Sequence, residues 1–409
     1  MNSRMKLFYF ATDTYPPWRV DLTELFSREL AGLGVQTDWS LRREDRGGWA
    51  SLQINSERYF LPPAWPGLPV ISPGIRRIGE LFGELLLFFR FIFGDRYDII
   101  QVRDDRYTAA LFAWLAARIR GSKFVYWVSF PFPENDFEKA ELTDGLKKVV
   151  FKWRGSLAKW WLYKFVLQRA DHVFVQSERM RLDIAAYGVR LEKMTAVPMG
   201  VPTRLVAWRK TIQPVIDRNS VVYLGSLARS RRLELVIHAF SRVLQQCPDA
   251  RLYMVGRGDT REDDQFLMDE CKREGLSDRV IFTGFMPMED AWELASRAAV
   301  CLSPFFPTPI FLQASPTKLN EYLALGRPAI ANEHPEQSLT MAASGAGLCV
   351  SWGAEDFAGA ICHLLMHPEE ADRMGEQGPA WVAEHRSYER IAADVFARYR
   401  SIVFEGSTA

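Results

Sequence analysis

The stretch SPTKLNEYLALGRP, residues 315–328, leads directly into the apolar run AIA, residues 329–331. Its Ser-Pro start and Gly-Arg-Pro end predict a short helix between a loop and a buried strand. Lys318 lies in the first turn of that helix, where its charge adds to exposed backbone N–H groups and suits a phosphate. Glu321 lies on a neighbouring position of the same helical face and suits a pair of sugar hydroxyls. The stretch therefore predicts a nucleotide-sugar site within an α/β domain.

The rest of the chain repeats this kind of unit. Short apolar runs alternate with amphipathic stretches, which is typical of parallel α/β units, and 409 residues favour two domains. A polar stretch with prolines at 202–219 interrupts the pattern and predicts an interdomain linker. We expect two doubly wound, Rossmann-like parallel-sheet domains that face each other across a cleft. They are an N-terminal domain at 1–203, a C-terminal domain at 204–385, and a final helix at about 386–409 that packs back on the first domain.

The composition excludes several classes of protein. The five cysteines are odd in number and contain no C-x-x-C pair, which favours reduced thiols over disulfides or a zinc site. The opening residues 1–10 are typical of a first strand rather than a signal peptide, and no apolar run reaches the length of a membrane span. The basic, Trp-rich segment at 147–169 could suggest a nucleic-acid partner, but no other feature of the sequence supports one. We therefore expect a cytoplasmic protein without a metal site.

One segment departs from the α/β rhythm. Residues 147–169 contain seven basic residues and no acidic one. Bulky apolar residues recur there at helical spacing, as interfacial membrane helices require. The same spacing also fits a helix that packs on its own sheet, so both interpretations stay open. The helix expected at 76–93 is similar, but Glu80 and Glu84 weaken its membrane interpretation. The apolar side of the basic segment consists of Val149, Trp153, Leu157, Trp160 and Trp161.

A second phosphate-type loop precedes the first along the chain. The apolar run at 221–224 ends in Gly225 and Ser226, and three arginines follow before the next helix. Small residues at the end of a strand let the backbone approach a diphosphate, and arginines at a helix start can neutralise it. Basic residues at a helix start are also common solvated features. The two loops would nevertheless lie at the carboxyl edge of one sheet and could converge on one ligand.

These motifs resemble the nucleotide-binding domain of retaining glycosyltransferases with the GT-B fold, family 4 type. The resemblance is specific in the second half of the chain, through residues 223–227, 252–258, 280–285, 315–328, 335–336 and 345–348. It is looser in the first half, through residues 15–17, 170–178 and 197–201. It implies an enzyme that transfers a sugar with retention, without a metal ion and without a cofactor beyond its nucleoside-diphosphate-sugar co-substrate.

The resemblance also implies roles for individual residues. Arg231, in place of the family's phosphate-binding lysine, and Lys318 would stabilise the diphosphate and are the catalytic candidates. Glu321 corresponds to the second glutamate of the family's E-x7-E motif and would bind the ribose. The donor-binding candidates are Gly225, Ser226, Arg229, Thr283, Gly284, Phe285, Gln313, Ser315, Pro316, Thr317 and Glu321. The acceptor-side candidates are Asp13, Tyr15, Arg19 and Ser129.

The chain departs from the family pattern at several positions. Gln313 stands where the first glutamate of E-x7-E is expected, so that contact to the donor sugar becomes neutral. Ser226 stands where the family has an arginine, and Ser129 where many members have a histidine. The paired glycines expected after Pro16 and Pro17 are absent. The nucleotide site is therefore carried over better than the sugar and acceptor sites.

The function expected from the resemblance is transfer of a sugar to a lipid-linked or polysaccharide acceptor. The protein would be at most peripherally associated with the inner face of the cytoplasmic membrane, through residues 147–169. Two alternatives remain, because a fold does not fix a function. One is a nucleotide-sugar epimerase or hydrolase. The other is a catalytically silent nucleotide-sugar-binding subunit of a polysaccharide assembly complex, which Gln313 and Ser226 favour.

Overall fold

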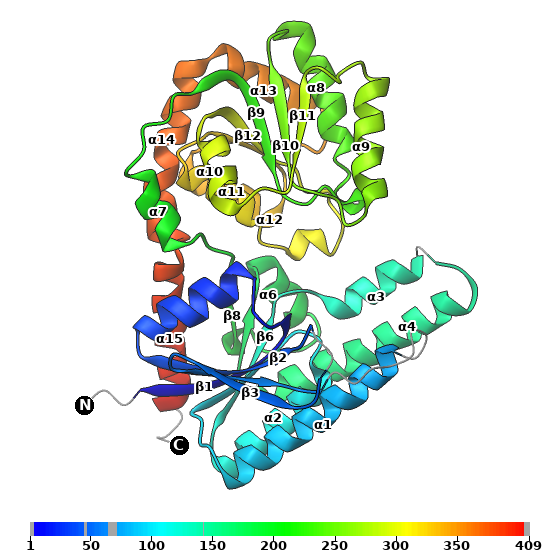
Figure 1. The fold of residues 1–409 in the computed structure, drawn as a ribbon, viewed down its shortest axis with the longest axis vertical. Helices are drawn as coiled ribbons and strands as arrows, with labels where there is room; N and C mark the ends of the chain where they lie inside the picture. Colours follow the sequence, from blue (N-terminus) through cyan, green and yellow to red (C-terminus); the bar gives the residue numbers. More distant parts are fainter. Residues whose placement is uncertain (1–3, 45–46, 64–71, 142, 405–409) are drawn as a thin grey trace. The chain divides into compact units, whose positions relative to one another are not determined.

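The computed structural model describes residues 4–44, 47–63, 72–141 and 143–404, and the end of the predicted final helix, 405–409, lies outside them. The chain divides into two compact units. The first unit comprises Met1–Pro198 with Ile391–Ala409, and the second comprises Met199–Arg390. Both contain a sheet covered by helices, so the prediction of two α/β domains is confirmed (Figure 1).

The second unit contains a six-stranded sheet in the order β11-β10-β9-β12-β13-β14 within the described residues. Every strand pair in it is parallel. Numbered from the first strand of the unit, the order is 3-2-1-4-5-6, the arrangement of dinucleotide-binding domains. The strand order reverses between β9 and β12, and ligands bind such sheets at that point. The strands are β9 (Asp217–Leu224), β10 (Arg251–Val255), β11 (Val280–Gly284), β12 (Ala298–Ser303), β13 (Ala329–Asn332) and β14 (Gly347–Val350).

Helices cover both faces of this sheet because its central strands are apolar on both sides. In β9, Val221 and Tyr223 belong to one buried cluster, whereas Val222 and Leu224 belong to the cluster on the opposite face. The first cluster includes residues of α8, α9 and α13, and the second includes residues of α7, α10, α11, α12 and α14. The helices are α7 (Thr203–Arg209), η4 (Arg229–Arg231), α8 (Glu234–Gln246), α9 (Arg261–Arg273), α10 (Met288–Ser296), η5 (Phe311–Gln313), α11 (Thr317–Ala324), α12 (Pro335–Ser344), α13 (Ala354–Met366) and α14 (Pro368–His385).

The predicted linker at 202–219 is in fact ordered structure. Helix α7 begins directly after Pro202, and β9 begins at Asp217. Leu205 of α7 is fully buried in the same cluster as β9 and α11. The short helix was missed because seven residues are too few to show a helical period beside the prolines.

The first unit contains an eight-stranded sheet in the order β3-β4-β2-β1-β5-β6-β7-β8 within the described residues. The pairing is parallel except for the hairpin β3–β4 at one edge, which the sequence pattern did not predict. The strand order reverses between β1 and β5, so a second binding edge is expected there. The strands are β1 (Met5–Thr14), β2 (Val35–Arg42), β3 (Ala50–Ile54), β4 (Glu57–Leu61), β5 (Ile99–Arg103), β6 (Lys123–Val128), β7 (His172–Val175) and β8 (Met194–Ala196).

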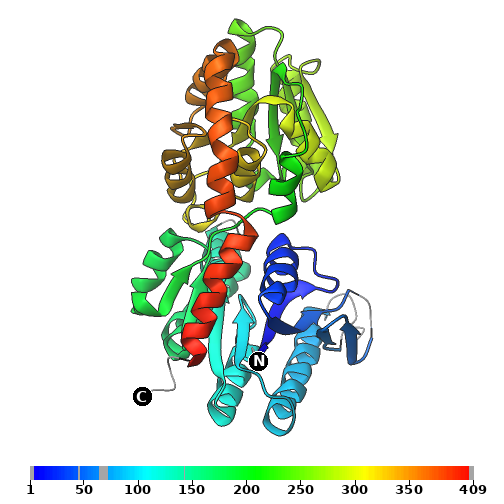
Figure 2. The ribbon, with the colours of Figure 1, turned by 90° about the vertical axis from the view of Figure 1, so that its left-hand side faces the viewer.

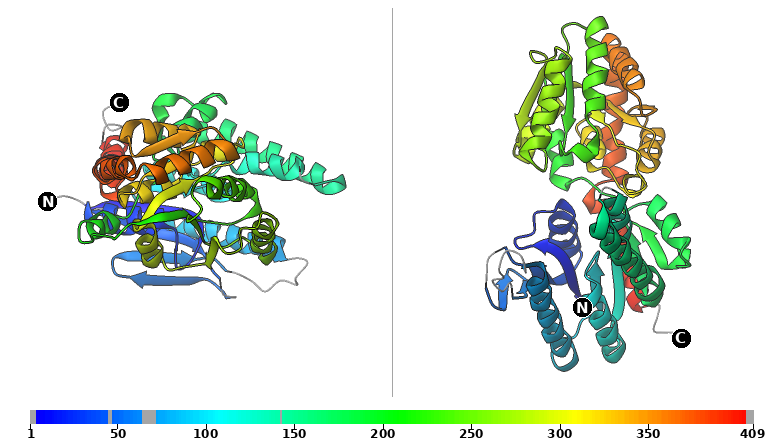
Figure 3. Two further views of the ribbon diagram at one scale, coloured as in Figure 1. Left: turned by 90° about the horizontal axis from the view of Figure 1, so that it is seen from above. Right: turned by 90° about the vertical axis from the view of Figure 1, so that its right-hand side faces the viewer.

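The helices of the first unit include a hairpin, α3–α4, that extends away from its sheet (Figures 1 and 3). The final helix α15 (Tyr388–Phe404) lies against the first unit from residue 391 onward (Figure 2). There the Tyr399 hydroxyl donates to Gln101 Oε1 at 2.6 Å. Among the residues that the structure describes, no helix combines the length and the hydropathy that a membrane crossing requires. The other helices are η1 (Asp21–Leu30), α1 (Ser72–Phe93), α2 (Tyr107–Arg120), α3 (Phe132–Glu141), α4 (Gly145–Lys159), η2 (Trp160–Val166), α5 (Leu167–Arg169), α6 (Glu178–Ala185) and η3 (Leu191–Lys193).

Candidate active site

The two phosphate-type loops meet in the second unit. Gly225, directly after β9, has a positive φ of 136°, and a Cβ added there would lie 3.0 Å from Lys318 Nζ. The hydroxyl of Tyr322 accepts a hydrogen bond from the Leu224 N–H at 2.7 Å, which holds α11 against the end of β9. The start of α11 and the end of β9 therefore form one edge at the point where the strand order reverses.

Two cations lie at this edge on aromatic side chains. Lys318 Nζ is 3.9 Å from the ring centroid of Tyr223 and 5.8 Å from that of Phe305. The Arg231 guanidinium is 5.4 Å from the same Phe305 ring and 4.7 Å from that of Phe311. Such contacts attract a cation only weakly and supply no counter-charge.

The electrostatics of the pair favour an anion. Within the described residues, the side chains of Lys318 and Arg231 make no hydrogen bond and no ion pair. Burial, together with the like charge of Arg231, lowers the pKa of Lys318 well below its usual value, although the Glu321 carboxylate opposes that shift. A cation that is held without a partner costs free energy until an anion binds beside it. The arrangement can therefore bind a diphosphate and neutralise charge on its oxygens.

Glu321 lies one turn after Lys318, and its carboxylate is held from α10. The indole N–H of Trp292 donates to Glu321 Oε1 at 3.2 Å. Burial raises the pKa of Glu321, although the Trp292 hydrogen bond and Lys318 oppose that shift. An oriented carboxylate in this environment is suited to accept hydrogen bonds from hydroxyl groups.

The backbone around the two cations is closely packed. Gly256, after β10, has a φ of 139°, and a Cβ there would collide with the carbonyl oxygen of Gly225. Its N–H donates to the Gly284 carbonyl at 3.0 Å, which joins the ends of β10 and β11. The Ser315 hydroxyl accepts from the Met199 N–H at 2.9 Å and holds the loop before α11.

Replacing Gly256 with alanine is expected to lower the free energy of unfolding by about 1–3 kcal/mol, because an alanine is strained at this positive φ and the Gly225 carbonyl must move. The displaced loop should also weaken nucleoside-diphosphate binding. Urea unfolding and calorimetric titration would measure the two effects. Gly359→Ala is the control, since a Cβ there meets nothing within 4 Å. Equal effects of the two substitutions would contradict the packing argument.

The remaining donor-side candidates are placed less centrally. Arg229 is exposed and lies over Phe266 of α9 at 4.2 Å, so the structure does not bring it to Lys318. The Thr283 hydroxyl donates to the Gly284 carbonyl at 3.0 Å, and the Phe285 side chain is 72% exposed. Gln313 is buried in η5, whereas Pro316 and Thr317 open α11. Ser226 Oγ accepts from the Ala228 N–H at 3.2 Å.

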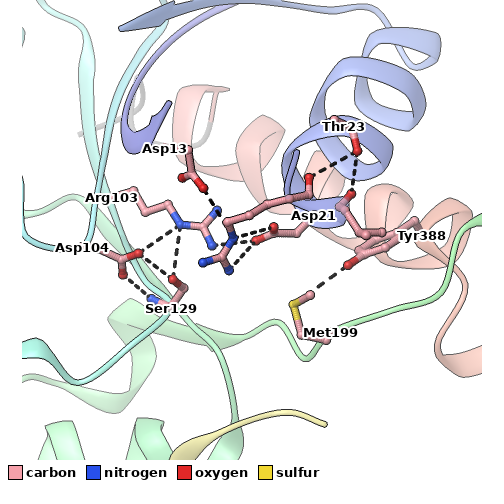
Figure 4. Close-up of polar contacts among 10 residues, drawn as sticks. Asp13, Asp21, Thr23, Arg103, Asp104, Ser129, Met199 and Tyr388 are labelled. Atoms are coloured by element: carbon pink, nitrogen blue, oxygen red, sulfur yellow. Dashed lines mark hydrogen bonds and ion pairs between the residues drawn. The ribbon is translucent and has the colours of Figure 1, made fainter. Parts of the chain in front are cut away.

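Three of the four acceptor-side candidates meet in the first unit, at the edge where its strand order reverses (Figure 4). Arg19 lies 3.8 Å from Asp13. The fourth, Tyr15, instead packs its ring against Tyr59, with centroids 5.1 Å apart. Ser129 is joined to the same network through two residues that the sequence did not single out, Arg103 and Asp104.

Arg103 is the centre of this network. It is fully buried, and its Nη2 donates to Asp21 Oδ2 at 2.6 Å. Its Nε lies 3.1 Å from Asp104 Oδ2 and 3.3 Å from Ser129 Oγ, while Ser129 Oγ donates to Asp104 Oδ2 at 2.6 Å. The buried Nη1 of Arg103 has no hydrogen-bond partner within the described residues.

The carboxyl groups of this network differ in the direction in which their pKa values are shifted. Burial alone would favour a neutral Asp21, but Arg103 and Arg19 together hold the pKa of its carboxyl far below the usual range. For Asp13 burial prevails, and its pKa is raised despite the same two arginines. Asp13 is therefore the carboxyl group of this edge with the greater tendency to hold a proton, which is a property of catalytic acids and bases.

The sequence carried one signal for the missed residues. Arg103 and Asp104 follow the apolar start of β5, and a charged pair at the carboxyl end of a buried strand marks the binding edge of a parallel sheet. A separate group, His238 of α8, Glu270 of α9 and Glu274 directly after α9, brings ligand atoms within 4.8 Å of one another. His238 Nε2 already lies 2.8 Å from Glu270 there, and the absence of a metal site stays a prediction.

Two protein families match the two halves of the chain. Residues 23–200 match the family described as Glycosyl transferase 4-like domain, and residues 218–367 match Glycosyl transferases group 1. The alpha-D-kanosaminyltransferase of Streptomyces kanamyceticus is 26% identical over 187 residues, which is 46% of this chain and 46% of that protein. The chain spans 30 to 60% of the length of the curated relatives it matches.

Solved structures show the same architecture over nearly the whole chain. Sucrose-phosphate synthase from Thermosynechococcus elongatus has a TM-score of 0.72 at 18% identity and covers 98% of this chain and 99% of that one. The Anabaena protein HepE in complex with UDP-glucose has a TM-score of 0.66 at 14% identity, with 97% and 100% covered. These likenesses show the fold, which is GT-B with two Rossmann-like domains.

Proposed function

Because this chain has the GT-B fold and both of its halves match glycosyltransferase domain families, we propose that it is a glycosyltransferase that uses a nucleoside-diphosphate sugar. The observation that carries the proposal is the pair Lys318 and Arg231, two basic side chains beside Gly225 whose like charges oppose each other and are only partly offset by Glu321. A diphosphate supplies the missing negative charge. The complex of the related Anabaena protein with UDP-glucose supports the same class of donor.

The reaction needs little more than stabilisation of the leaving group. When the bond between the sugar and the diphosphate breaks, negative charge grows on the phosphate oxygens. Lys318 and Arg231, with the N–H groups at the start of α11, would stabilise that charge in place of a metal ion. Glu321 would accept hydrogen bonds from the ribose hydroxyls, and Thr283–Phe285 would lie against the base.

We propose transfer with retention of the anomeric configuration. The carboxylate nearest to the two cations, Glu321, is already engaged by Trp292 and suits the ribose better than a nucleophilic role. Retention is what the resemblance to retaining family 4 enzymes implies, and without a nucleophilic side chain it requires the acceptor to attack from the face from which the diphosphate leaves. The proton magnetic resonance spectrum of the first product formed would show the configuration of the new bond. An inverted product would exclude this mechanism.

We propose that the polar edge around Asp13 and Arg103 is the acceptor side. Asp13 would accept the proton of the attacking hydroxyl, since its raised pKa favours proton uptake. The acceptor we propose is lipid-linked or a polysaccharide, and the protein would act in the cytoplasm at the membrane surface.

The experiment that tests the function is a panel of radiolabelled nucleoside-diphosphate sugars offered with lipid-linked and saccharide acceptors. Transfer of label to an acceptor is the expected result. Release of free sugar or of an epimer would instead show a hydrolase or epimerase. Binding without turnover would show a silent subunit, the alternative favoured by the neutral Gln313 in the E-x7-E position.

Replacing Glu321 with glutamine is expected to weaken nucleoside-diphosphate binding by about tenfold, because an amide replaces a charged acceptor of two ribose hydrogen bonds. Inorganic pyrophosphate lacks the ribose, so its affinity should change by less than about twofold. Calorimetric titration of both ligands gives the comparison. Equal losses for the two ligands would show that Glu321 acts on the diphosphate and not on the ribose.

A further inference from the structure

Two helices of the first unit present apolar side chains to solvent. On α1, Ile78, Leu81, Phe82, Leu85, Phe89 and Phe93 are exposed at helical spacing. On α4 and the start of η2, the exposed apolar residues are Leu146, Val149, Val150, Trp153, Leu157 and Trp160. Trp153 is 68% exposed and Phe93 is 82% exposed. Side chains of this size are normally buried, so two such stripes in one unit indicate an interaction surface.

The acidic residues of α1 do not interrupt its stripe. Glu84 is buried and lies 3.0 Å from Arg106 Nη2, and Glu80 lies 2.8 Å from Arg42 Nε. Both carboxylates therefore point into the first unit. Because Glu80 and Glu84 face inward in the structure, they no longer argue against a membrane interpretation of α1.

A groove of about 940 Å³ joins the two stripes. Ile78 and Leu81 of α1 line it together with Val150, Trp153 and Leu157 of α4. Its floor includes Leu111 of α2 and Trp161 of η2. Among its polar lining residues, Arg154 is paired with Asp136 at 2.7 Å and Arg42 is paired with Glu80. The volume and the apolar lining suit a hydrocarbon chain.

The charge beside the groove selects the partner. Residues 145–169 contain seven basic side chains and no acidic one, and Lys147 of α4 is exposed. Acidic residues of α3 pair with four of the seven, namely Lys148 and Lys152 with Glu141, Arg154 with Asp136 and Lys159 with Glu134, so the surface stays basic through the other three. A second copy of this chain, joined by a symmetric interface, would bring the same basic helices together and repel. A bilayer surface with anionic headgroups attracts them.

We propose that the face formed by α1 and α4, the α1–α4 face, binds a bilayer containing anionic lipid, and that its groove takes up the hydrocarbon chain of one lipid. The aromatic side chains enter the boundary between headgroups and acyl chains, and the lysines contact the headgroup phosphates. The surface does not depend on the transfer reaction proposed above. If that reaction uses a lipid-linked acceptor, the groove is where its chain would lie.

The test compares vesicles of phosphatidylcholine alone with vesicles that also contain phosphatidylglycerol, without any sugar donor. The full chain is expected to co-sediment with the anionic vesicles, and raising the salt concentration should release it. The double substitution Val149→Glu with Trp153→Glu should lower the partition coefficient at least about tenfold, because two exposed apolar groups no longer enter the bilayer. Ile119→Glu, an equally exposed residue of α2, is the matched control and should bind like the unmodified protein.

The groove is tested by phosphatidylglycerol with a photoreactive diazirine in its acyl chain. Cross-links are expected on peptides of α1 and α4, and Leu157→Asp should remove them from α4. Circular dichroism and nucleoside-diphosphate binding would confirm that each variant is folded. The proposal is overturned if binding is equal on neutral and anionic vesicles, if the double substitution leaves it unchanged, or if the chain forms a dimer that the double substitution dissociates.

Discussion

Replacing Lys318 with methionine is expected to weaken nucleoside-diphosphate binding by about 100-fold, because a hydrogen bond between charged groups is lost at a site with little water. The ligand-free protein should unfold at the same or a higher temperature. Burial and Arg231 disfavour the charged form of Lys318 more than Glu321 favours it, and methionine removes the amine while keeping the length of the side chain. Calorimetric titration and thermal unfolding measure the two effects.

The opposite signs of these effects separate a binding role from a structural one. Lys272→Met replaces an exposed lysine of α9 and is the control. It should change neither the nucleoside-diphosphate affinity nor the unfolding temperature. Arg231→Met should weaken binding in the same direction, since Arg231 lies over the same Phe305 ring. Unchanged affinity in both the Lys318 and the Arg231 variants would remove the diphosphate site from this edge.

The same lysine makes binding depend on pH. Burial lowers the pKa of Lys318 in the ligand-free protein, and a bound diphosphate favours the protonated form. Affinity should therefore fall as the pH rises through the lowered pKa, and binding should take up protons between that lowered pKa and about pH 10.4. Stability of the ligand-free protein should rise with pH over the same interval, because the unfolded chain binds more protons there. Titrations in buffers of different ionisation enthalpy measure the uptake, which Lys318→Met should abolish.

Replacing Arg103 with alanine is expected to lower the free energy of unfolding by about 3–5 kcal/mol, because Asp104 would be left buried without its counter-charge and Asp21 would keep only Arg19. Urea unfolding measures the loss. Arg19→Ala removes an arginine that is 30% exposed and should cost much less. Adding Asp21→Asn to Arg103→Ala should recover part of the loss, since it removes a buried charge that has lost one of its partners.

Acid should unfold the first unit through the same network. The pKa of Asp21 is lowered in the folded state, so its ion pairs stabilise the protein above the ordinary aspartate pKa of about 3.9. That stability is lost as the pH falls through the lowered pKa. The Asp21→Asn variant should lack this pH-dependent contribution to the free energy of unfolding at every pH. An unchanged acid midpoint would show that Asp21 is not the group concerned.

The sequence by itself determined the fold class and the placement of the two phosphate-type loops at one sheet edge. Residues 315–331 contain a helix start, a helix end and a strand in one local pattern, and the residues at 221–226 contain the matching strand end. Local predictions of this kind remain correct in the folded protein because each element is short and its ends are marked by proline and glycine. The prediction that Gly225 and Lys318 share one sheet edge needed only the rule that parallel strands end together.

The tertiary structure alone decided the acceptor-side network and the α1–α4 face. Arg103 and Asp21 are 82 positions apart and meet only because β5 lies beside β1 in the sheet. The period of residues 147–169 is the same whether the helix packs inward or faces solvent, and only its placement leaves Trp153 exposed. Sequence patterns record which residues share a face, whereas strand order and helix placement decide what that face meets.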